Sequence, residues 1–187
     1  MGENKAEMEI CGKTLLERTL NIMEPVVNKI VVMLNPTQAE PVVRGPMANM
    51  ISFGRDSRQK QGPLQGIADA LPLLPEKSEN IFVVTCDLPY LTEEWLISMK
   101  KAFTEDVDVV HAVDDGITNP LLALYRRRVL WRANDLLDDN QRRPIRLWDG
   151  FHLVGMSPPP DDPMVCKDIN TPEEFQQAKR ALSTQCS

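Results

Sequence analysis

Ile81-Phe82-Val83-Val84-Thr85-Cys86-Asp87-Leu88-Pro89 is the stretch of the chain that decides the fold. It begins with an apolar run of strand length containing two adjacent β-branched valines, a pattern typical of a strand buried on both faces. The run stops at Asp87, and Pro89 prevents it from continuing as an inner strand. In open α/β sheets, ligands bind where such strands end. We therefore expect Asp87 to hold Mg²⁺ and, through the ion, the phosphates of a substrate.

Strand and helix patterns alternate along the rest of the chain. This predicts a single α/β domain over residues 1–187, a three-layer Rossmann-like sandwich whose mostly parallel sheet carries helices on both faces. A hairpin-like stretch at 114–125 makes the sheet mixed. Strands are expected at 30–34, 49–53, 81–84, 107–113, 119–125, 151–154 and 165–169, and helices at 14–23, 37–44, 62–74, 92–103, 126–137, 143–148 and from Thr171 onward.

Composition excludes several classes of function. A net charge of −6, with the basic residues dispersed, disfavours a nucleic-acid partner. The sequence has no long apolar span and no signal peptide, so we expect no membrane contact and a cytoplasmic location. Four cysteines lie far apart in the sequence, and we expect free thiols in a reducing compartment: Cys11, Cys86, Cys166 and Cys186.

Five short motifs follow one another along nearly the whole chain. They are Gly62-Pro63-Leu64-Gln65-Gly66-Ile67, Thr85-Cys86-Asp87-Leu88-Pro89-Tyr90, Asn119-Pro120-Leu121, Arg143-Pro144 and Asp168-Ile169-Asn170-Thr171-Pro172-Glu173. In this order they resemble molybdenum cofactor guanylyltransferase, within the wider nucleotidyltransferase superfamily. The resemblance implies a fold of the nucleotide-diphospho-sugar transferase type. It also implies transfer of GMP from Mg·GTP to a molybdopterin-bound molybdenum cofactor, with release of pyrophosphate.

The resemblance implies a nucleotide site and a catalytic pair. The nucleotide-binding residues would be Gly2, Lys5, Asn35, Asp56, Gly62 and Asp87. Lys5 and Asp87 would be catalytic: Lys5 would offset phosphate charge, and Asp87 would be the metal ligand for Mg²⁺. The plainer interpretation is that Asn35 and Asp56 only form turns after strands. A second alignment places the family's asparagine at Met33 in place of Asn35.

The same resemblance implies a site for the pterin substrate. Its residues would be Asn119, Arg143, Asp168 and Asn170. Arginine suits bidentate contacts with a phosphate, although solvated surface charge is the competing interpretation of Arg143. Asn170 precedes Thr171, which is the better helix cap, so its side chain is available for ligand contacts.

The amino terminus departs from the family pattern. The family begins with a strand and a Gly-rich loop, and Met1-Gly2-Glu3-Asn4-Lys5 matches only the end of that loop. We expect the first strand and the phosphate loop to be missing before Met1, through a start codon set too late, a truncated chain or a paralogue that has lost catalysis. An inner strand missing from the sheet would leave backbone groups unpaired. We therefore expect lowered stability or self-association as a homo-oligomer.

Two other functions stay open on the sequence alone. The first is transfer of CMP or another nucleotide to the same kind of phosphorylated acceptor. The second is a non-catalytic nucleotidyltransferase fold that binds a partner. In either transferase, the acceptor is already a phosphate anion, so positioning and charge neutralisation suffice and no strong general base is required.

Overall fold

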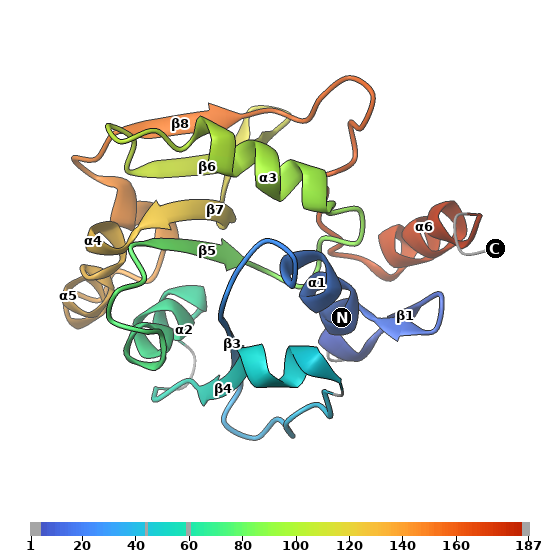
Figure 1. Cartoon of the computed structure of the whole chain (residues 1–187), viewed down its shortest axis with the longest axis horizontal. Helices are drawn as coiled ribbons and strands as arrows, with labels where there is room; N and C mark the ends of the chain where they lie inside the picture. Colours follow the sequence, from blue (N-terminus) through green and yellow to red (C-terminus); the bar gives the residue numbers. More distant parts are fainter. Residues whose placement is uncertain (1–4, 44, 59–60, 185–187) are drawn as a thin grey trace.

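The computed structural model describes residues 5–43, 45–58 and 61–184 of the 187-residue chain (Figure 1). A four-stranded sheet has the spatial order β5 (Asn80–Val84), β7 (Ile117–Arg126), β6 (Val109–Asp114) and β8 (Leu153–Met156). A separate parallel pair consists of β3 (Ile30–Leu34) and β4 (Ile51–Arg55). A short hairpin consists of β1 (Glu9–Ile10) and β2 (Lys13–Thr14).

The larger sheet is mixed, as predicted. β7 runs antiparallel to both β5 and β6, whereas β6 and β8 are parallel. Parallel pairing therefore does not dominate this sheet, and the expectation of a mostly parallel sheet is wrong for its hydrogen-bonded pairs. The reason is that β7 returns from β6 through the tight turn at Asp115 and Gly116, both of which have positive φ.

Helices cover both faces of the sheets. The α-helices are α1 (Leu15–Met23), α2 (Pro63–Ala70), α3 (Glu93–Ala102), α4 (Arg127–Leu130), α5 (Ala133–Asp138) and α6 (Pro172–Ser183). Four 3₁₀ turns are η1 (Lys5–Glu7), η2 (Pro46–Met50), η3 (Leu71–Leu73) and η4 (Pro144–Trp148). Thr92 and Thr171 cap α3 and α6 as predicted, each accepting a hydrogen bond from the third residue of its helix.

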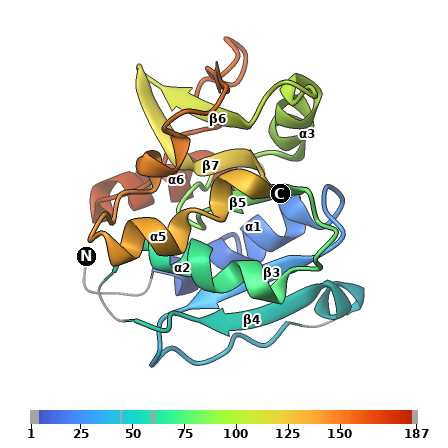
Figure 2. The ribbon, with the colours of Figure 1, turned by 90° about the vertical axis from the view of Figure 1, so that its left-hand side faces the viewer.

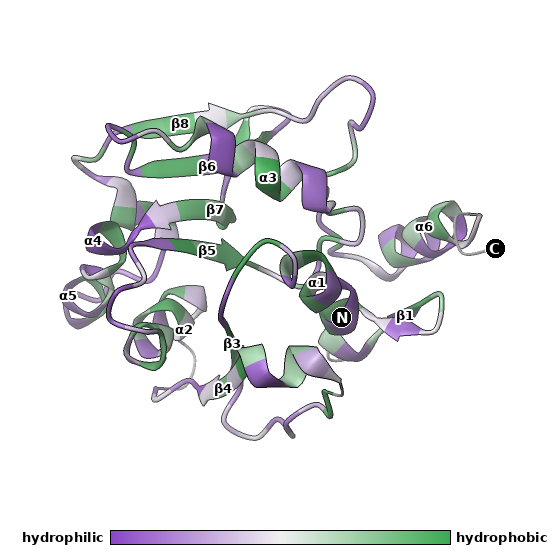
Figure 3. Ribbon diagram, in the orientation of Figure 1, coloured by the Kyte–Doolittle hydropathy of each residue, from purple (hydrophilic) through white to green (hydrophobic). Residues whose placement is uncertain are grey.

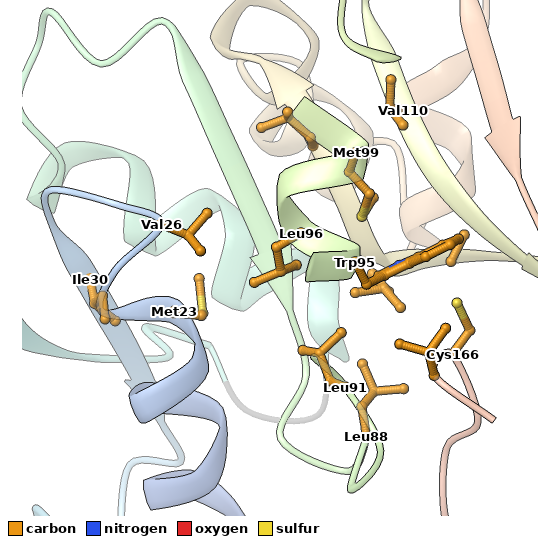
Figure 4. Close-up of a cluster of buried hydrophobic side chains, with 14 of the residues drawn as sticks. Met23, Val26, Ile30, Leu88, Leu91, Trp95, Leu96, Met99, Val110 and Cys166 are labelled. Atoms are coloured by element: carbon orange, nitrogen blue, oxygen red, sulfur yellow. The ribbon is translucent and has the colours of Figure 1, made fainter. Parts of the chain in front are cut away.

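Alternation along β7 divides the core into two layers. Leu122 and Leu124 belong to the cluster built with α1 and α3, whereas Ala123 and Tyr125 belong to the cluster built with α2, α4 and α5. Figure 4 shows Trp95 of α3 close to Cys166 in the first of these clusters. Apolar colour follows strands β5, β6 and β8 in Figure 3. The sandwich of three layers is confirmed.

Several predicted elements differ in the structure, and the expected helix at 62–74 is divided into α2 and η3. Residues 165–169 form no strand, because Val165 and Cys166 are buried in one core cluster and Ile169 in another, so the segment bridges clusters. Residues 37–43 form no helix, since Pro41 lacks an N–H and disfavours helical backbone in the residue before it. The expected helix at 126–137 is divided into α4 and α5.

The cysteines also differ from expectation. Cys86 and Cys166 are free, but Cys11 is disulfide-bonded. The β1–β2 hairpin lies against α6, where Cys11 Sγ is 3.7 Å from the carbonyl oxygen of Leu182. Sequence separation therefore did not exclude a disulfide, because folding places the β1–β2 hairpin beside the last turns of α6.

None of the helices in the described part of the chain is long and apolar enough to cross a membrane.

β3 and β5 each have one edge that no described strand pairs with. β3 pairs only with β4, and β5 pairs only with β7. Figures 1 and 2 both show the β3–β4 pair lying below β5, apart from the larger sheet. A cavity of about 1260 Å³ lies there, and all five residues of each strand line it. Residues that point to opposite faces of a strand can line one cavity only where the strand's edge borders it.

We call this space the β3–β5 cavity. α1 borders it with Leu16, Leu20 and Met23, and α2 borders it with Gly66 and Ile67. The cavity is thus bordered by apolar side chains of α1 and α2 and by the free edges of β3 and β5. The volume exceeds the roughly 300–1,000 Å³ that is usual for a small-molecule pocket.

The cavity explains why β5 is less buried than its sequence predicts. Ile81 is buried, but Phe82, Val83 and Val84 are only half-buried. The expectation of a strand buried on both faces is therefore wrong for these three residues. Their apolar side chains border open space at the free edge of β5.

The 187-residue chain should have low stability or associate with itself, because two unpaired strand edges and apolar helix faces border the cavity. Thermal melting monitored by circular dichroism, with sedimentation measured at several protein concentrations, tests this. We expect a low or broad transition, or a midpoint that rises with concentration as oligomers form. A sharp, concentration-independent melt of a monomer at high temperature would contradict the prediction.

Candidate functional site

Asp87 lies at the end of β5 with both carboxylate oxygens engaged. The Thr85 hydroxyl donates to Oδ1 at 2.8 Å, and the Lys5 ammonium donates to Oδ2 at 3.2 Å. The backbone carbonyl of Asp87 accepts from the Ile169 N–H at 3.0 Å. These contacts fix the carboxylate beside the β3–β5 cavity, which Asp87 lines.

Lys5 joins two motifs that are distant in the sequence. Besides Asp87, its Nζ donates to the carbonyl oxygen of Ile169 at 2.7 Å and to Asn170 Oδ1 at 3.0 Å. Asn170 in turn donates through Nδ2 to Asp168 Oδ2 at 3.0 Å. An ammonium has three N–H donors, so all three are used here. Lys5 can therefore contact a phosphate only by exchanging one of these acceptors.

The ends of β3 and β4 bring two further predicted residues to the same cavity. Asn35 and Asp56 both line it, and the Asp56 N–H donates to the carbonyl oxygen of Leu34 at 3.2 Å. Partial burial, and then the negative charge of Asp69, raise the pKa of the Asp56 carboxyl above its ordinary value. The side chain at Met33, the alternative to Asn35, packs toward Gly54 and Gly66.

The start of α2 presents bare backbone to the cavity. Gly62 precedes the helix with φ of 73°, a conformation that favours glycine. A Cβ atom at Gly66 would lie 3.4 Å from Asp56 Oδ1, in van der Waals contact with the carboxylate. Both glycines line the cavity. Glycines on both sides of the first turn of a helix let a polar or anionic ligand group approach the backbone closely.

The predicted site residues therefore fall into two sets. Five of the nucleotide residues share the cavity: Lys5, Asn35, Asp56, Gly62 and Asp87. Gly2 lies outside the described residues. Asp168 and Asn170 do not line the cavity but are linked to Asp87 through Lys5.

Asn119 and Arg143 are not brought into the cavity. Asn119 Oδ1 accepts from the Leu121 N–H at 2.9 Å, beside the register shift between β6 and β7. Arg143 is exposed and precedes η4. Sequence reasoning missed a different residue, Thr85, although it lies only two residues before Asp87 in the same motif and its hydroxyl reaches that carboxylate.

The donor set around Asp87 fits Mg²⁺. The Thr85 hydroxyl contacts the carboxylate, and the network through Lys5 adds hard oxygen atoms from the Asn170 amide and the Asp168 carboxylate. The described residues contain no cluster of three or more His, Cys, Asp or Glu side chains that could hold a metal. Mg²⁺ itself uses only one or two carboxylates together with phosphate oxygens and water.

Comparison with known proteins identifies the family. The profile of the MobA-like NTP transferase domain matches residues 1–150. The chain belongs to this family. Among the relatives of this MobA-like domain is the molybdenum cofactor guanylyltransferase of Photobacterium profundum, 29% identical over 181 residues that cover 97% of this chain and 89% of the relative.

Solved structures agree on the fold of the MobA-like domain. Molybdopterin-guanine dinucleotide biosynthesis protein A from Archaeoglobus fulgidus superposes with a TM-score of 0.73 at 21% identity, over 98% of this chain and 92% of that one. The 2-C-methyl-D-erythritol 4-phosphate cytidylyltransferase from Thermus thermophilus superposes equally well, with a TM-score of 0.73 at 14% identity, over 97% and 95% of the two chains. The predicted fold type is confirmed.

Replacing Lys5 by Met should strengthen divalent-ion binding at Asp87, because it frees Oδ2 and removes a competing positive charge. We expect an affinity for Mn²⁺ about fivefold higher, corresponding to ~1 kcal/mol. Titration of Mn²⁺ followed by electron paramagnetic resonance measures this directly. Lys13→Met, at an exposed lysine of the hairpin, is the matched control and should leave the affinity unchanged. Equal or weaker binding by Lys5→Met would oppose this assignment.

Proposed function

We propose that this MobA-like domain transfers GMP from Mg·GTP to a molybdopterin-type phosphate acceptor. The observation that carries the proposal is the meeting of Asp87, Asp56, Lys5 and the start of α2 at one cavity. The relatives named as molybdenum cofactor guanylyltransferases support the choice of nucleotide and acceptor. We place the activity in the cytoplasm.

In the proposed reaction, an oxygen of the acceptor phosphate attacks the α-phosphorus of GTP. A new phosphorus–oxygen bond forms as the bond to the β-phosphate breaks, and pyrophosphate leaves. Asp87, held by Thr85, would carry Mg²⁺, which when bound neutralises charge on the phosphates. Lys5 would exchange one of its present acceptors for a phosphate oxygen and stabilise the charge that develops there.

The remaining residues of the cavity would orient the nucleotide. Asn35 and Asp56 would contact the nucleoside from the ends of β3 and β4, and Gly62 would allow it close approach to the backbone. On the acceptor side, Asp168 and Asn170 would contact the pterin near Lys5. We assign Asn119 and Arg143 to the outer part of the same acceptor, with the arginine on its phosphate.

We also propose that a strand followed by a Gly-rich loop fills the β3–β5 cavity in the active form of the protein. An extended segment in the cavity would pair with β3 along one edge and with β5 along the other, and each of these strands has five residues. The apolar walls from α1 and α2 would bury its side chains. The loop would reach the mouth of the cavity beside Lys5 and Asp87, where backbone N–H groups could bind the triphosphate.

A chain extended before Met1 by such a strand and loop should melt at a higher temperature than the 187-residue chain. We expect a rise of roughly 5 °C or more, the shift that ~2 kcal/mol gives in a domain of this size. The matched control carries the same extension with prolines at alternate strand positions, which cannot pair on both edges. If the two extensions give the same melting temperature, the cavity does not receive a strand.

Asp87→Asn should abolish the magnesium dependence of GTP binding in the extended chain, because it removes the negative charge with which the carboxylate would hold Mg²⁺. We expect the Kd for Mg·GTP to rise by at least about tenfold, or ~1.4 kcal/mol. Calorimetric titration with and without Mg²⁺ measures the effect, and the exposed Asp161→Asn is the control. Unchanged, Mg²⁺-dependent binding by Asp87→Asn would remove the basis of the proposal.

Incubation of the extended chain with molybdopterin and equal concentrations of Mg·GTP and Mg·CTP should give the guanine dinucleotide and pyrophosphate. Mass spectrometry of the pterin products separates the outcomes. A cytosine dinucleotide would mean that the protein is a cytidylyltransferase, the activity named for its fold neighbour from Thermus thermophilus. No dinucleotide at all would favour a non-catalytic binding protein.

A further inference from the structure

The loop after β4 is held by two side chains of α2. Asp69 accepts from the Ser57 N–H at 2.7 Å and from the Ser57 hydroxyl at 3.0 Å. Gln65 donates through Nε2 to the same hydroxyl at 3.0 Å and to Asp69 Oδ2 at 2.8 Å. Gln65 and Asp69 are one helical turn apart, so they present their side chains on the same face of α2.

Gln65 is an unusual residue for its position. It is 2% exposed, although glutamine is mostly found at protein surfaces. Its amide nitrogen must face Asp69, because a carboxylate only accepts hydrogen bonds. Its Oε1 atom is then buried without a partner among the described residues. A buried acceptor without a donor is destabilising, so folding stability alone is a poor reason for placing glutamine here.

Gln65 itself does not border the β3–β5 cavity, whereas its neighbours Pro63, Gly66 and Ile67 do. Its effect on a ligand therefore passes through the residues that it contacts, Ser57 and Asp69. Ser57 directly follows Asp56, whose carboxylate oxygen lies against the backbone at Gly66. With the Asp56 N–H bonded to Leu34, the segment is fixed on both sides of the carboxylate.

We propose that Gln65 and Asp69 are positioning residues for the nucleotide: they hold Ser57 and thereby fix the Asp56 carboxylate at the wall of the β3–β5 cavity. The claim that a nucleotide is bound rests on the proposed function, whereas the claim that Gln65 and Asp69 fix the position of Asp56 does not. It assigns to Gln65, within Gly62-Pro63-Leu64-Gln65-Gly66, a role that the motif alone does not indicate.

A double-mutant cycle separates positioning from a general loss of structure. Gln65→Met keeps the size of the side chain and removes the amide, so it should raise the Kd for Mg·GTP about fivefold. In an Asp56→Ala background the same substitution should change the Kd by less than about twofold, since the group that Gln65 positions is gone. Gln141→Met, at an exposed glutamine, is the matched control and should behave like the parent in both backgrounds.

Two results would overturn the proposal. One is an unchanged Kd for Gln65→Met in the parent background, and the other is an equal loss of affinity in both backgrounds. Asp69→Asn should raise the Kd for Mg·GTP as Gln65→Met does. An amide has only one oxygen, so it cannot accept from both the N–H and the hydroxyl of Ser57 as the two carboxylate oxygens do.

A second readout does not depend on GTP. If no version of the protein binds GTP, the proposed function fails. Carbon-13 NMR titration of the Asp56 carboxyl in the full chain then tests whether Gln65 positions Asp56, without any nucleotide. Burial raises the pKa of Asp56, and so does the charge of Asp69. Release of the loop in Gln65→Met should expose the carboxyl and lower its pKa toward the ordinary value, while Gln141→Met should leave the pKa unchanged. An unaltered pKa in Gln65→Met would overturn the positioning role.

Discussion

The free edges of β3 and β5 are the constraint on which the rest of the structure depends. Each strand is paired on one side only, and the cavity between them is bordered by apolar residues of α1 and α2. Backbone N–H and C=O groups at such edges must find partners in water, in another segment or in another chain. This one feature connects the reduced burial of β5, the division into two sheets and the expected weakness of the isolated chain.

The same constraint places the candidate site. Asp87 ends β5, Asp56 and Asn35 follow β4 and β3, and all three line one cavity although they belong to different sheets. Lys5 then connects Asp87 to the segment before α6 through Ile169 and Asn170. A polypeptide segment between the sheets would therefore complete the core and the phosphate side of the site together, so stability and nucleotide binding should be coupled.

Sequence patterns predicted the parts of this architecture that depend on local chemistry. Apolar runs gave β3 and β5, threonine caps gave the starts of α3 and α6, and the strand-to-proline pattern singled out Asp87. Tertiary contacts decided the rest. Residues 165–169 resemble a strand but turn between two core clusters, and Phe82 to Val84 have the composition of an inner strand but border a cavity. The three acceptors of Lys5 and the contact of Gln65 with Ser57 join segments whose spacing in the sequence carries no signal.

Hydrogen–deuterium exchange of the 187-residue chain, resolved to short peptides by mass spectrometry, tests the central claim most directly. Peptides that cover 30–34 and 80–84 should exchange much faster than those that cover 117–126, because β7 is paired on both sides whereas β3 and β5 each have a free edge. Equal, strong protection of all three regions in a monomer would mean that the two edges are already satisfied. In that case the β3–β5 cavity could not organise the structure as described.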